Sequence, residues 1–175
     1  FEISLRGFHN AMNFLFSYAV SKELGIKFGK RTKLNFNIIE GRNNIIHTKK
    51  ITIMDETYNA SIESVKSCIE VLLDQKGRHF IILGSIKELG KDSIKFHNEI
   101  LELINNLNIQ KCIFLCNISL EEELKKFYSR NNKILFINDK YKICKIINQL
   151  TRCGDSLLIK GSRYWALEEI IPYID

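Results

Sequence analysis

The chain has 175 residues, 45% of them hydrophobic and 26% charged, with a formal net charge of +6. This is the composition of an ordinary globular protein, long enough for one full domain and part of a second. The lysines are scattered, with no Arg-rich run, so we favour a solvated basic surface over a nucleic-acid-binding patch. No apolar run approaches the roughly 18 residues of a membrane span, so we expect none.

The cysteines indicate a reducing compartment. They are Cys68, Cys112, Cys116, Cys144 and Cys153. None forms a CxxC pair, and an odd number argues against a disulfide framework. Cys112 and Cys116 flank a short apolar run and would share one face of a strand. We therefore expect free core thiols and a cytoplasmic protein. The sequence begins at Phe1 without the regions of a signal peptide, and we interpret Phe1 as an interior residue of a longer chain.

The predicted elements begin with a helix over residues 8–24, where apolar residues recur at helical spacing and Gly25 can end the helix. Residues 26–49 are polar, with short strands expected in "FNII" and "NIIH" around a turn at Gly41. From Lys50 onward, short apolar runs alternate with helical segments. The predicted strands are 50–54, 79–85, 111–116, 133–138 and 156–161, and the predicted helices are 61–74, 92–107, 119–129, 139–150 and 164–171.

This alternation is typical of βαβ units and predicts an α/β fold, a mostly parallel sheet with helices on both faces. In such sheets, ligands bind beyond the carboxyl ends of the strands. Three of the loops at that edge are rich in polar side chains, namely "DETYNAS", "GSIKELGKDS" and "KGSR". We therefore expect a binding site at this edge.

Asp55 ends a predicted strand, and two interpretations of it stay open. As a turn former, it would accept hydrogen bonds from the residues that follow. However, Ser61, with Ser64 three residues later, is better placed to cap the next helix. That leaves Asp55 available for a ligand hydroxyl or a cation.

The segment 160–163 lies where a buried strand meets the predicted N-terminus of a helix. A helix N-terminus offers free backbone N–H groups and a partial positive charge. Together with Lys160, Ser162 and Arg163, this favours a phosphate or carboxylate site over a solvated turn capped by Ser162.

Several catalytic motifs are absent from the sequence. His97 falls inside a predicted helix with no Cys, His or Asp at metal-ligand spacing, so we expect no zinc site. No GxSxG motif or Cys/His pair indicates a catalytic nucleophile, and no GxxxxGK[ST] motif provides a P-loop.

Five segments in chain order resemble motifs of the Mur ligases: "GFHNAMNFLFSYAVSKELGI", "EGR", "DETYNAS", "LGSIKELGKDSIKFH" and "IKGSRYWALEE". The family members that add D-alanyl-D-alanine to UDP-N-acetylmuramoyl-tripeptide typically read "GxHNxxNxxAAxAxAxxLGI", "GR", "DDSYNANP", "LGDMxELGxxSxxxH" and "VKGSRxxxxE" at these places. The tyrosine–asparagine turn and the "ELG" segment favour this type over ligases of the family with other amino-acid substrates. The resemblance covers nearly the whole chain.

The resemblance implies two regions. Residues 1–40 would be the C-terminal end of a central ATP-binding domain, and residues 41–175 the Rossmann-like C-terminal domain. The UDP-sugar domain, the P-loop and a carbamylated lysine would lie outside this chain, which alone would be inactive.

The implied reaction of peptidoglycan synthesis uses ATP and Mg²⁺, the metal being held mainly by the missing part of the central domain. An acyl phosphate forms on the tripeptide and is attacked by the amine of D-Ala-D-Ala, while the C-terminal domain closes and excludes water. The enzyme would be a cytoplasmic monomer that binds no nucleic acid.

The resemblance also implies binding roles, although it assigns no certain catalytic residue. The nucleotide-binding residues would be Asn10 and Asn13 near the adenine, Arg42 at the phosphates, Asp55 at the ribose, and Tyr58 and Asn59 beside them. The substrate-binding residues would be Asn59, Lys160, Ser162 and Arg163, the last three at the dipeptide carboxylate.

The sequence departs from the family pattern at several positions. Ser85 stands where the family usually has Asp, Ile86 where it has Met, and Ser61-Ile62 where it has "NP". The Lys, Asn and Ile bias suggests an AT-rich genome, in which a ligase can decay by drift. The alternatives are therefore a decayed Mur ligase, a ligase with another amino-acid substrate, and a non-catalytic α/β module that binds a nucleotide or an anion.

Overall fold

A computed structural model describes residues 2–3, 8–29, 33–34, 39–128 and 130–175. Its elements, in chain order, are β1 (Glu2–Ile3), α1 (Phe8–Glu23), β2 (Lys33–Leu34), β3 (Asn44–His47), β4 (Thr52–Glu56), α2 (Ile62–Leu73), β5 (His79–Gly84), η1 (Gly90–Asp92), α3 (Ser93–Asn106), β6 (Lys111–Leu115), α4 (Ile118–Tyr128), β7 (Ile134–Ile137), α5 (Tyr141–Leu150), β8 (Ser156–Lys160), η2 (Arg163–Trp165) and η3 (Leu167–Tyr173). The strands and helices predicted between residues 50 and 161 are confirmed, within a few residues at their ends. The predicted strand "NIIH" is β3, whereas "FNII" lies mostly outside the described residues.

The last predicted helix differs in type. Residues 164–171 fall in two short 3-10 helices, η2 and η3, rather than in one α-helix. The break lies at Ala166, whose φ of 45° places it in the left-handed region, where an α-helix cannot continue.

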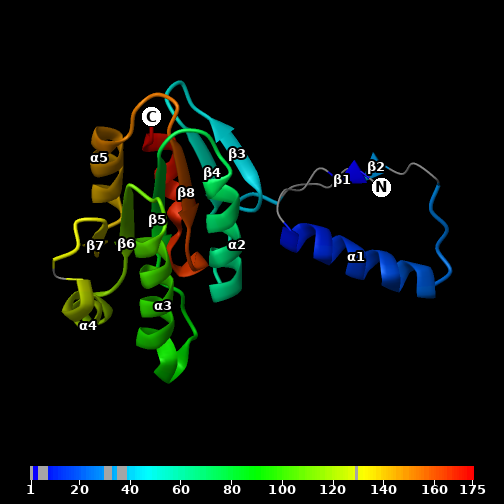
Figure 1. Ribbon diagram of the computed structural model, residues 1–175, viewed down its shortest axis with the longest axis horizontal. Coiled ribbons are helices and arrows are strands. Elements are labelled where there is room, and N and C mark those ends of the chain that lie inside the picture. Colours follow the sequence, from blue (N-terminus) through cyan, green and yellow to red (C-terminus); the bar gives the residue numbers. More distant parts are fainter. Residues whose placement is uncertain (1, 4–7, 30–32, 35–38, 129) are drawn as a thin grey trace.

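The strands β3 to β8 form one six-stranded sheet in the order β3-β4-β8-β5-β6-β7 (Figure 1). The strand β3 pairs antiparallel with β4, and the other pairs are parallel, so the predicted α/β fold is confirmed. The strand β8 returns to lie between β4 and β5. As a result, the ends of β4 and β8 are neighbours, and Glu56 pairs in register with Lys160.

The two faces of the sheet carry separate apolar cores, because side chains alternate along a strand. Met54 and Leu158 pack on the face that α2, α3 and α4 cover. Ile53 and Leu157 pack on the opposite face, against α5 and η3. We call these the α2 face and the η3 face. Both cores consist largely of Ile, Leu and Phe, as expected for strands buried on both sides.

All five cysteines are free thiols; Cys68, Cys112 and Cys116 are buried as expected for core side chains, whereas Cys144 is half-buried and Cys153 is exposed. Cys112 and Cys116 both belong to the core of the α2 face, as their spacing predicts, and neither forms a disulfide. Burial raises the pKa of each thiol to about 12, which keeps it protonated. These two residues fill space and are not poised for reaction.

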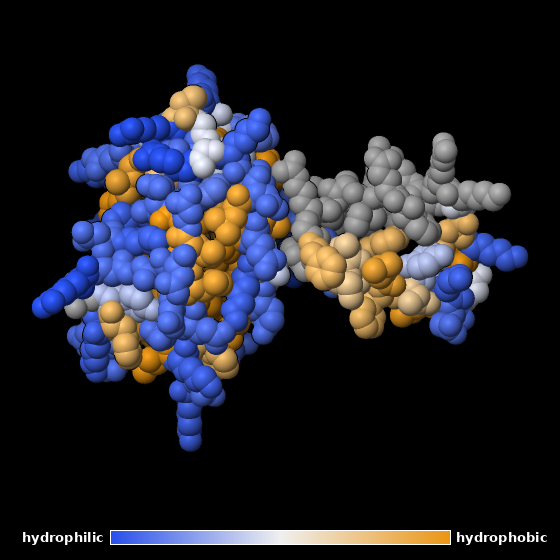
Figure 2. Space-filling view, viewed as in Figure 1, coloured by the Kyte–Doolittle hydropathy of each residue, from blue (hydrophilic) through white to orange (hydrophobic). Residues whose placement is uncertain are grey.

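The helix α1 lies apart from the sheet (Figure 1). Several of its large apolar side chains are exposed, including Phe8 at 77%, Phe16 at 72% and Val20 at 55%. Figure 2 shows hydrophobic residues gathered along this helix. In the part of the chain that the structure describes, no helix has both the length and the apolar character needed to cross a bilayer.

Candidate functional site

The carboxyl ends of β4 and β8 carry most of the residues that the sequence points to. Asp55 and Glu56 are the last two residues of β4, and their side chains face opposite sides of the sheet because of the strand alternation. Glu56 continues the row of Met54 on the α2 face, beside its in-register neighbour Lys160. Asp55 continues the row of Ile53 on the η3 face. The edge therefore has two chemically different sides.

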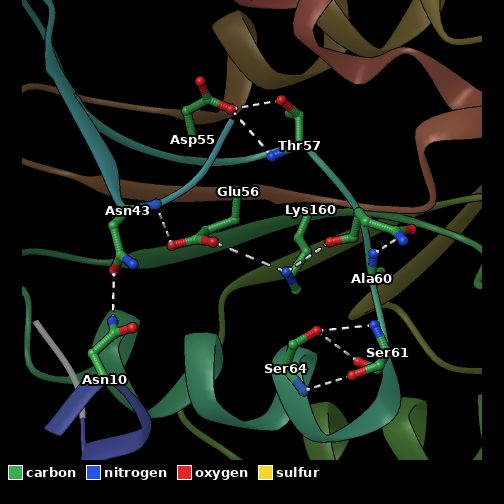
Figure 3. A network of polar contacts seen from close by, with 10 residues as sticks. Asn10, Asn43, Asp55, Glu56, Thr57, Ala60, Ser61, Ser64 and Lys160 are labelled. Atoms are coloured by element: carbon green, nitrogen blue, oxygen red, sulfur yellow. Dashed lines mark hydrogen bonds and ion pairs between the residues drawn. The ribbon is translucent and has the colours of Figure 1, made fainter. Parts of the chain in front are cut away.

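A chain of polar contacts on the α2 face connects α1 to the sheet (Figure 3). Asn10 Nδ2 donates to Asn43 Oδ1 at 3.2 Å, and the Asn43 N–H donates to Glu56 Oε1 at 3.0 Å. Glu56 Oε2 lies 4.0 Å from Lys160 Nζ, which donates to the carbonyl oxygen of Asn59 at 2.9 Å. The contacts join four segments that are distant in the sequence.

Lys160 is only 3% exposed, so its charge must be compensated inside the protein. The Glu56 carboxylate supplies an opposite charge, and the Asn59 carbonyl oxygen accepts a hydrogen bond from the ammonium group. These contacts hold the turn after β4 in place. The ammonium of Lys160 is thus engaged within the protein in this structure, whereas the sequence led us to expect it at a ligand.

Asp55 forms the turn that follows it. The carboxylate is 5% exposed, and its Oδ1 accepts hydrogen bonds from Thr57 N–H at 3.2 Å and Thr57 Oγ1–H at 2.7 Å. Its Oδ2 has a long contact of 3.5 Å with Asn44 Nδ2. The turn-forming interpretation therefore accounts for one oxygen, and the second has the greater capacity for a ligand.

The start of α2 is capped as its sequence predicts. Ser61 Oγ accepts the Ser64 N–H at 3.2 Å, and Ser64 Oγ accepts the Ser61 N–H at 2.9 Å (Figure 3). This reciprocal pair is a capping box, which satisfies two backbone N–H groups at the helix start. Asp55 takes no part in the cap.

Two hollows open at this edge, one on each face of the sheet. The α2-side hollow has a volume of about 340 Å³, and its lining includes Asn10, Asn13, Arg42, Asn59 and Lys160. The η3-side hollow has a volume of about 510 Å³, and its lining includes Asn44, Asp55, Arg163, Ile171 and Pro172. Both volumes are in or near the usual range of small-molecule sites. Gly41 and Tyr58 line both hollows and form their shared rim.

The rim depends on a glycine. Gly41 has a φ of +75°, and a Cβ at this position would lie 2.7 Å from Tyr58 N. Its carbonyl oxygen accepts the Tyr58 N–H at 2.9 Å. A larger residue would push the segment before β3 away from Tyr58, so glycine is needed at this position.

The Tyr58 ring contacts two guanidinium groups. The Cζ atoms of Arg42 and Arg163 lie 4.1 Å and 5.3 Å from the ring centroid. Both distances are within the range of a cation–π interaction. Arg42 lines the α2-side hollow and Arg163 the η3-side hollow, so each hollow receives one of these cations.

The segment after β8 corrects one expectation. The strand that ends at Lys160 is present, but η2 after it has only three residues, and Ser162 makes no side-chain cap hydrogen bond. So short a 3-10 helix provides no helix N-terminus for an anion, because the dipole argument requires a regular helix of several turns. Ser162 is 8% exposed and lines neither of the two hollows.

The loop after β5 is held from two sides. Trp165 Nε1–H donates to the Ser85 carbonyl at 2.9 Å and lies 3.2 Å from Ser85 Oγ. The Ile86 N–H donates to His97 Nε2 at 2.8 Å, while His97 Nδ1 contacts the Ser93 carbonyl at 2.7 Å. This pattern requires a neutral imidazole with its proton on Nδ1. Burial lowers the pKa of His97, which agrees with that state.

The sequence reasoning did not identify Glu56 and Asn43 as site residues. Glu56 lines the α2-side hollow and is the charge partner of Lys160, and Asn43 links it to α1. Strand alternation alone would have separated Glu56 from Asp55. The neighbour of Glu56 on β8, however, depends on the strand order, which the sequence does not reveal.

The described ranges contain no group of three or more His, Cys, Asp or Glu side chains that could hold a metal ion. The two arginines and the asparagines Asn10 and Asn13, in contrast, offer the cations and amide groups that suit a nucleotide.

The polar carboxyl edge and its two arginines lie where open α/β sheets generally bind their ligands, and comparison with known proteins identifies the family of this α/β domain. Residues 41–163 match the family model described as "Mur ligase, glutamate ligase domain". The chain therefore belongs to the Mur ligase family.

Several relatives and solved structures that resemble the chain are Mur ligases of one type. The chain is 29% identical to the UDP-N-acetylmuramoyl-tripeptide–D-alanyl-D-alanine ligase of Buchnera aphidicola subsp. Baizongia pistaciae, over 98% of this chain and 37% of that protein. With the Bacillus subtilis ligase of the same name, the identity is 27% over 98% of this chain and 39% of the relative. The crystal structure of the MurF ligase from Thermotoga maritima in complex with ADP superimposes with a TM-score of 0.82 and 29% identity, over 98% of this chain and 39% of that one. The chain thus spans less than two fifths of the length of these relatives.

Proposed function

We propose that this chain is the C-terminal part of an ATP-dependent ligase that joins D-Ala-D-Ala to UDP-N-acetylmuramoyl-tripeptide in peptidoglycan synthesis. The observation that carries the proposal is the match, across 98% of the chain, to a MurF ligase structure that holds ADP. The curated relatives with the same coverage carry the name of this activity. The complete enzyme would act in the cytoplasm as a monomer.

The proposal divides the chain at residue 40. Residues 1–40 would end the central ATP-binding domain, and residues 41–175 would form the C-terminal domain. The exposed apolar side chains of α1 support this division, because a helix with such a surface is normally covered by a larger domain. The Gly41 rim and the Asn10–Asn43 hydrogen bond lie at the boundary.

In the proposed reaction, a carboxylate oxygen of the tripeptide attacks the γ-phosphorus of ATP, and ADP leaves. The dipeptide nitrogen then attacks the acyl carbon, so that a C–N bond forms, the C–O bond to phosphate breaks, and phosphate and a proton are released. Exclusion of water protects the acyl phosphate from hydrolysis. In this proposal, the residues that hold the Mg²⁺, which would neutralise the phosphates, belong mainly to the part of the central domain outside this chain.

This chain would contribute binding and orientation. Asn10, Asn13 and Arg42, which share the α2-side hollow, would contact the nucleotide, and Asn59 lies beside them. Arg163, in the η3-side hollow with Asp55, would bind the dipeptide carboxylate. Asp55 would then reach the ribose through Oδ2, from the other side of the Tyr58 rim.

The test is phosphate release by the full-length parent protein with ATP, Mg²⁺ and UDP-N-acetylmuramoyl-tripeptide. Release that requires D-Ala-D-Ala, and that L-Ala-L-Ala does not support, is the expected result. The L,L-dipeptide is a matched control, since it has the same charges and atoms and differs only in configuration. Absence of release from the folded parent would reject the proposal in favour of a decayed ligase or a non-catalytic module.

A further inference from the structure

Tyr58 stands where three separate segments of the chain converge. Its ring is approached by Arg42 from the segment before β3 and by Arg163 from the segment after β8. Tyr58 itself follows β4, and its N–H is bound to the Gly41 carbonyl at 2.9 Å. The ring therefore starts from a fixed backbone, while both arginines have long flexible side chains.

The charge partners available to the two guanidinium groups decide how far the ring can position them. In the described ranges, neither Arg42 nor Arg163 forms an ion pair with a carboxylate. Both side chains belong to exposed residues, and an exposed arginine normally samples many rotamers. The ring contact is what favours one position for each cation, at the rim between the hollows.

We propose that Tyr58 is a positioning residue, which holds Arg42 toward one hollow and Arg163 toward the other so that one side chain sets the affinity for two anionic ligands. The proposal rests on the proposed function, which gives the nucleotide phosphates to Arg42 and the dipeptide carboxylate to Arg163. Tyr58 then acts through the arginines, and the π-face of its ring is the part that matters. The phenol hydroxyl is dispensable.

This role differs from a direct contact with a ligand. If Tyr58 stacked on the adenine, its loss would weaken ATP binding without affecting the dipeptide. If it bound the dipeptide alone, the reverse would hold. Loss of a ring that orders both arginines should weaken the binding of both ligands. Without the ring, each guanidinium group loses its preferred position and must be ordered when its ligand binds.

The experiment compares Tyr58→Leu and Tyr58→Phe in the full-length parent protein, by the KM for ATP and the KM for D-Ala-D-Ala. Tyr58→Leu removes the π-system and should raise both KM values, each by about two- to fivefold. Tyr58→Phe keeps the ring and should stay near the parent values. Tyr173→Leu is the matched control and should alter neither KM, because Tyr173 is an exposed tyrosine that lines neither hollow.

A rise in only one KM, or in neither, would overturn the proposal. So would a Tyr58→Phe variant as impaired as Tyr58→Leu, since the hydroxyl would then be the active group. Thermal unfolding of each variant separates these effects from a loss of stability.

A binding measurement keeps this proposal separate from the proposed function. Calorimetry with inorganic tripolyphosphate, which has no base to stack, should show about two- to fivefold weaker binding by Tyr58→Leu than by the parent. Equal binding by the two proteins, or no binding by the parent, would contradict the positioning role. If the parent releases no phosphate in the ligase assay, the proposed function fails, and this measurement still decides the role of Tyr58.

Discussion

Apolar side chains are buried to very different degrees in the helix α1 and in the sheet domain, by which we mean the six-stranded sheet with the elements that cover its two faces. In the sheet domain, Phe114 is 0% exposed in a core that its own elements close, whereas Phe16 of α1 is 72% exposed. The same residue type is thus fully buried in one region and largely exposed in the other. The difference supports the proposed division of the chain at residue 40, and it predicts that the sheet domain folds without help from α1.

Replacing one phenylalanine in each region is the strongest test of this comparison. Phe114→Ala should lower the free energy of unfolding by about 3–5 kcal/mol, because it leaves a cavity in the core. Phe16→Ala, the matched change in α1, should alter it by less than about 0.5 kcal/mol. Urea unfolding of this chain measures both values. Similar costs for the two variants would show that α1 belongs to the same cooperative core.

The next largest effect is expected where the sheet domain buries a charge. Lys160→Ala removes the cation that lies 4.0 Å from the Glu56 carboxylate and the donor of the hydrogen bond to the Asn59 carbonyl. The expected cost is about 2–4 kcal/mol, since a buried group that loses its partner retains its desolvation penalty.

A matched double variant isolates the charge at Lys160. Lys160→Met combined with Glu56→Gln keeps the side-chain volumes and removes both charges, and it should recover part of the stability lost in Lys160→Met. If Lys160→Ala and Lys160→Met leave the unfolding midpoint in urea unchanged, Lys160 is not the internal support that its contacts indicate. That result would favour the expectation from the sequence that Lys160 binds the carboxylate of the dipeptide.

Much of the sheet domain was predictable from local pattern alone. Continuous apolar runs such as "HFIIL" identify buried parallel strands, and Ser61 with Ser64 identifies the start of α2. The helix type of residues 164–171 was not predictable, because Ala166 adopts a left-handed conformation that is not expected of an alanine.

The site was predictable only in part, for a topological reason. The loops that bear Asp55, Tyr58 and Arg163 do meet at one edge of the sheet, as the rule for parallel strands requires. The pairing of Glu56 with Lys160 arises because β8 inserts beside β4, and no local pattern encodes that order. Strand alternation places Asp55 and Lys160 on opposite faces of the sheet, so the side chains of this edge line two hollows rather than one.

Acid should weaken the sheet domain through His97. Burial lowers the pKa of His97 in the folded chain below its ordinary value of 6.5. The neutral imidazole is therefore favoured by folding, and its contribution to stability is complete above pH 6.5 and is lost as the pH falls from 6.5 toward the lower folded pKa.

Protonation would also place a proton on Nε2, where the Ile86 N–H now donates. Urea unfolding between pH 7 and pH 5 should show this loss, and His97→Leu should flatten the slope over that interval. An unchanged slope in His97→Leu would assign the acid sensitivity to another group. His47→Leu, a change at an exposed histidine, serves as the control and should retain the slope.

The smallest expected effect lies at the contact between the two regions. Asn10→Ala removes the hydrogen bond to Asn43, which is worth about 0.5–1.5 kcal/mol. Because the bond joins α1 to the sheet domain without supporting either core, unfolding of the sheet domain should be unaffected while the position of α1 becomes less defined. Spin labels at Ser21 on α1 and Glu70 on α2 report this through the width of their distance distribution.

The distribution should broaden in Asn10→Ala and stay as it is in Ser17→Ala, which removes a hydrogen bond internal to α1. An unchanged width in Asn10→Ala would mean that other contacts hold the helix in place. A lower unfolding midpoint in the same variant would mean that the sheet domain does rely on α1, which would contradict the independence that its closed cores imply.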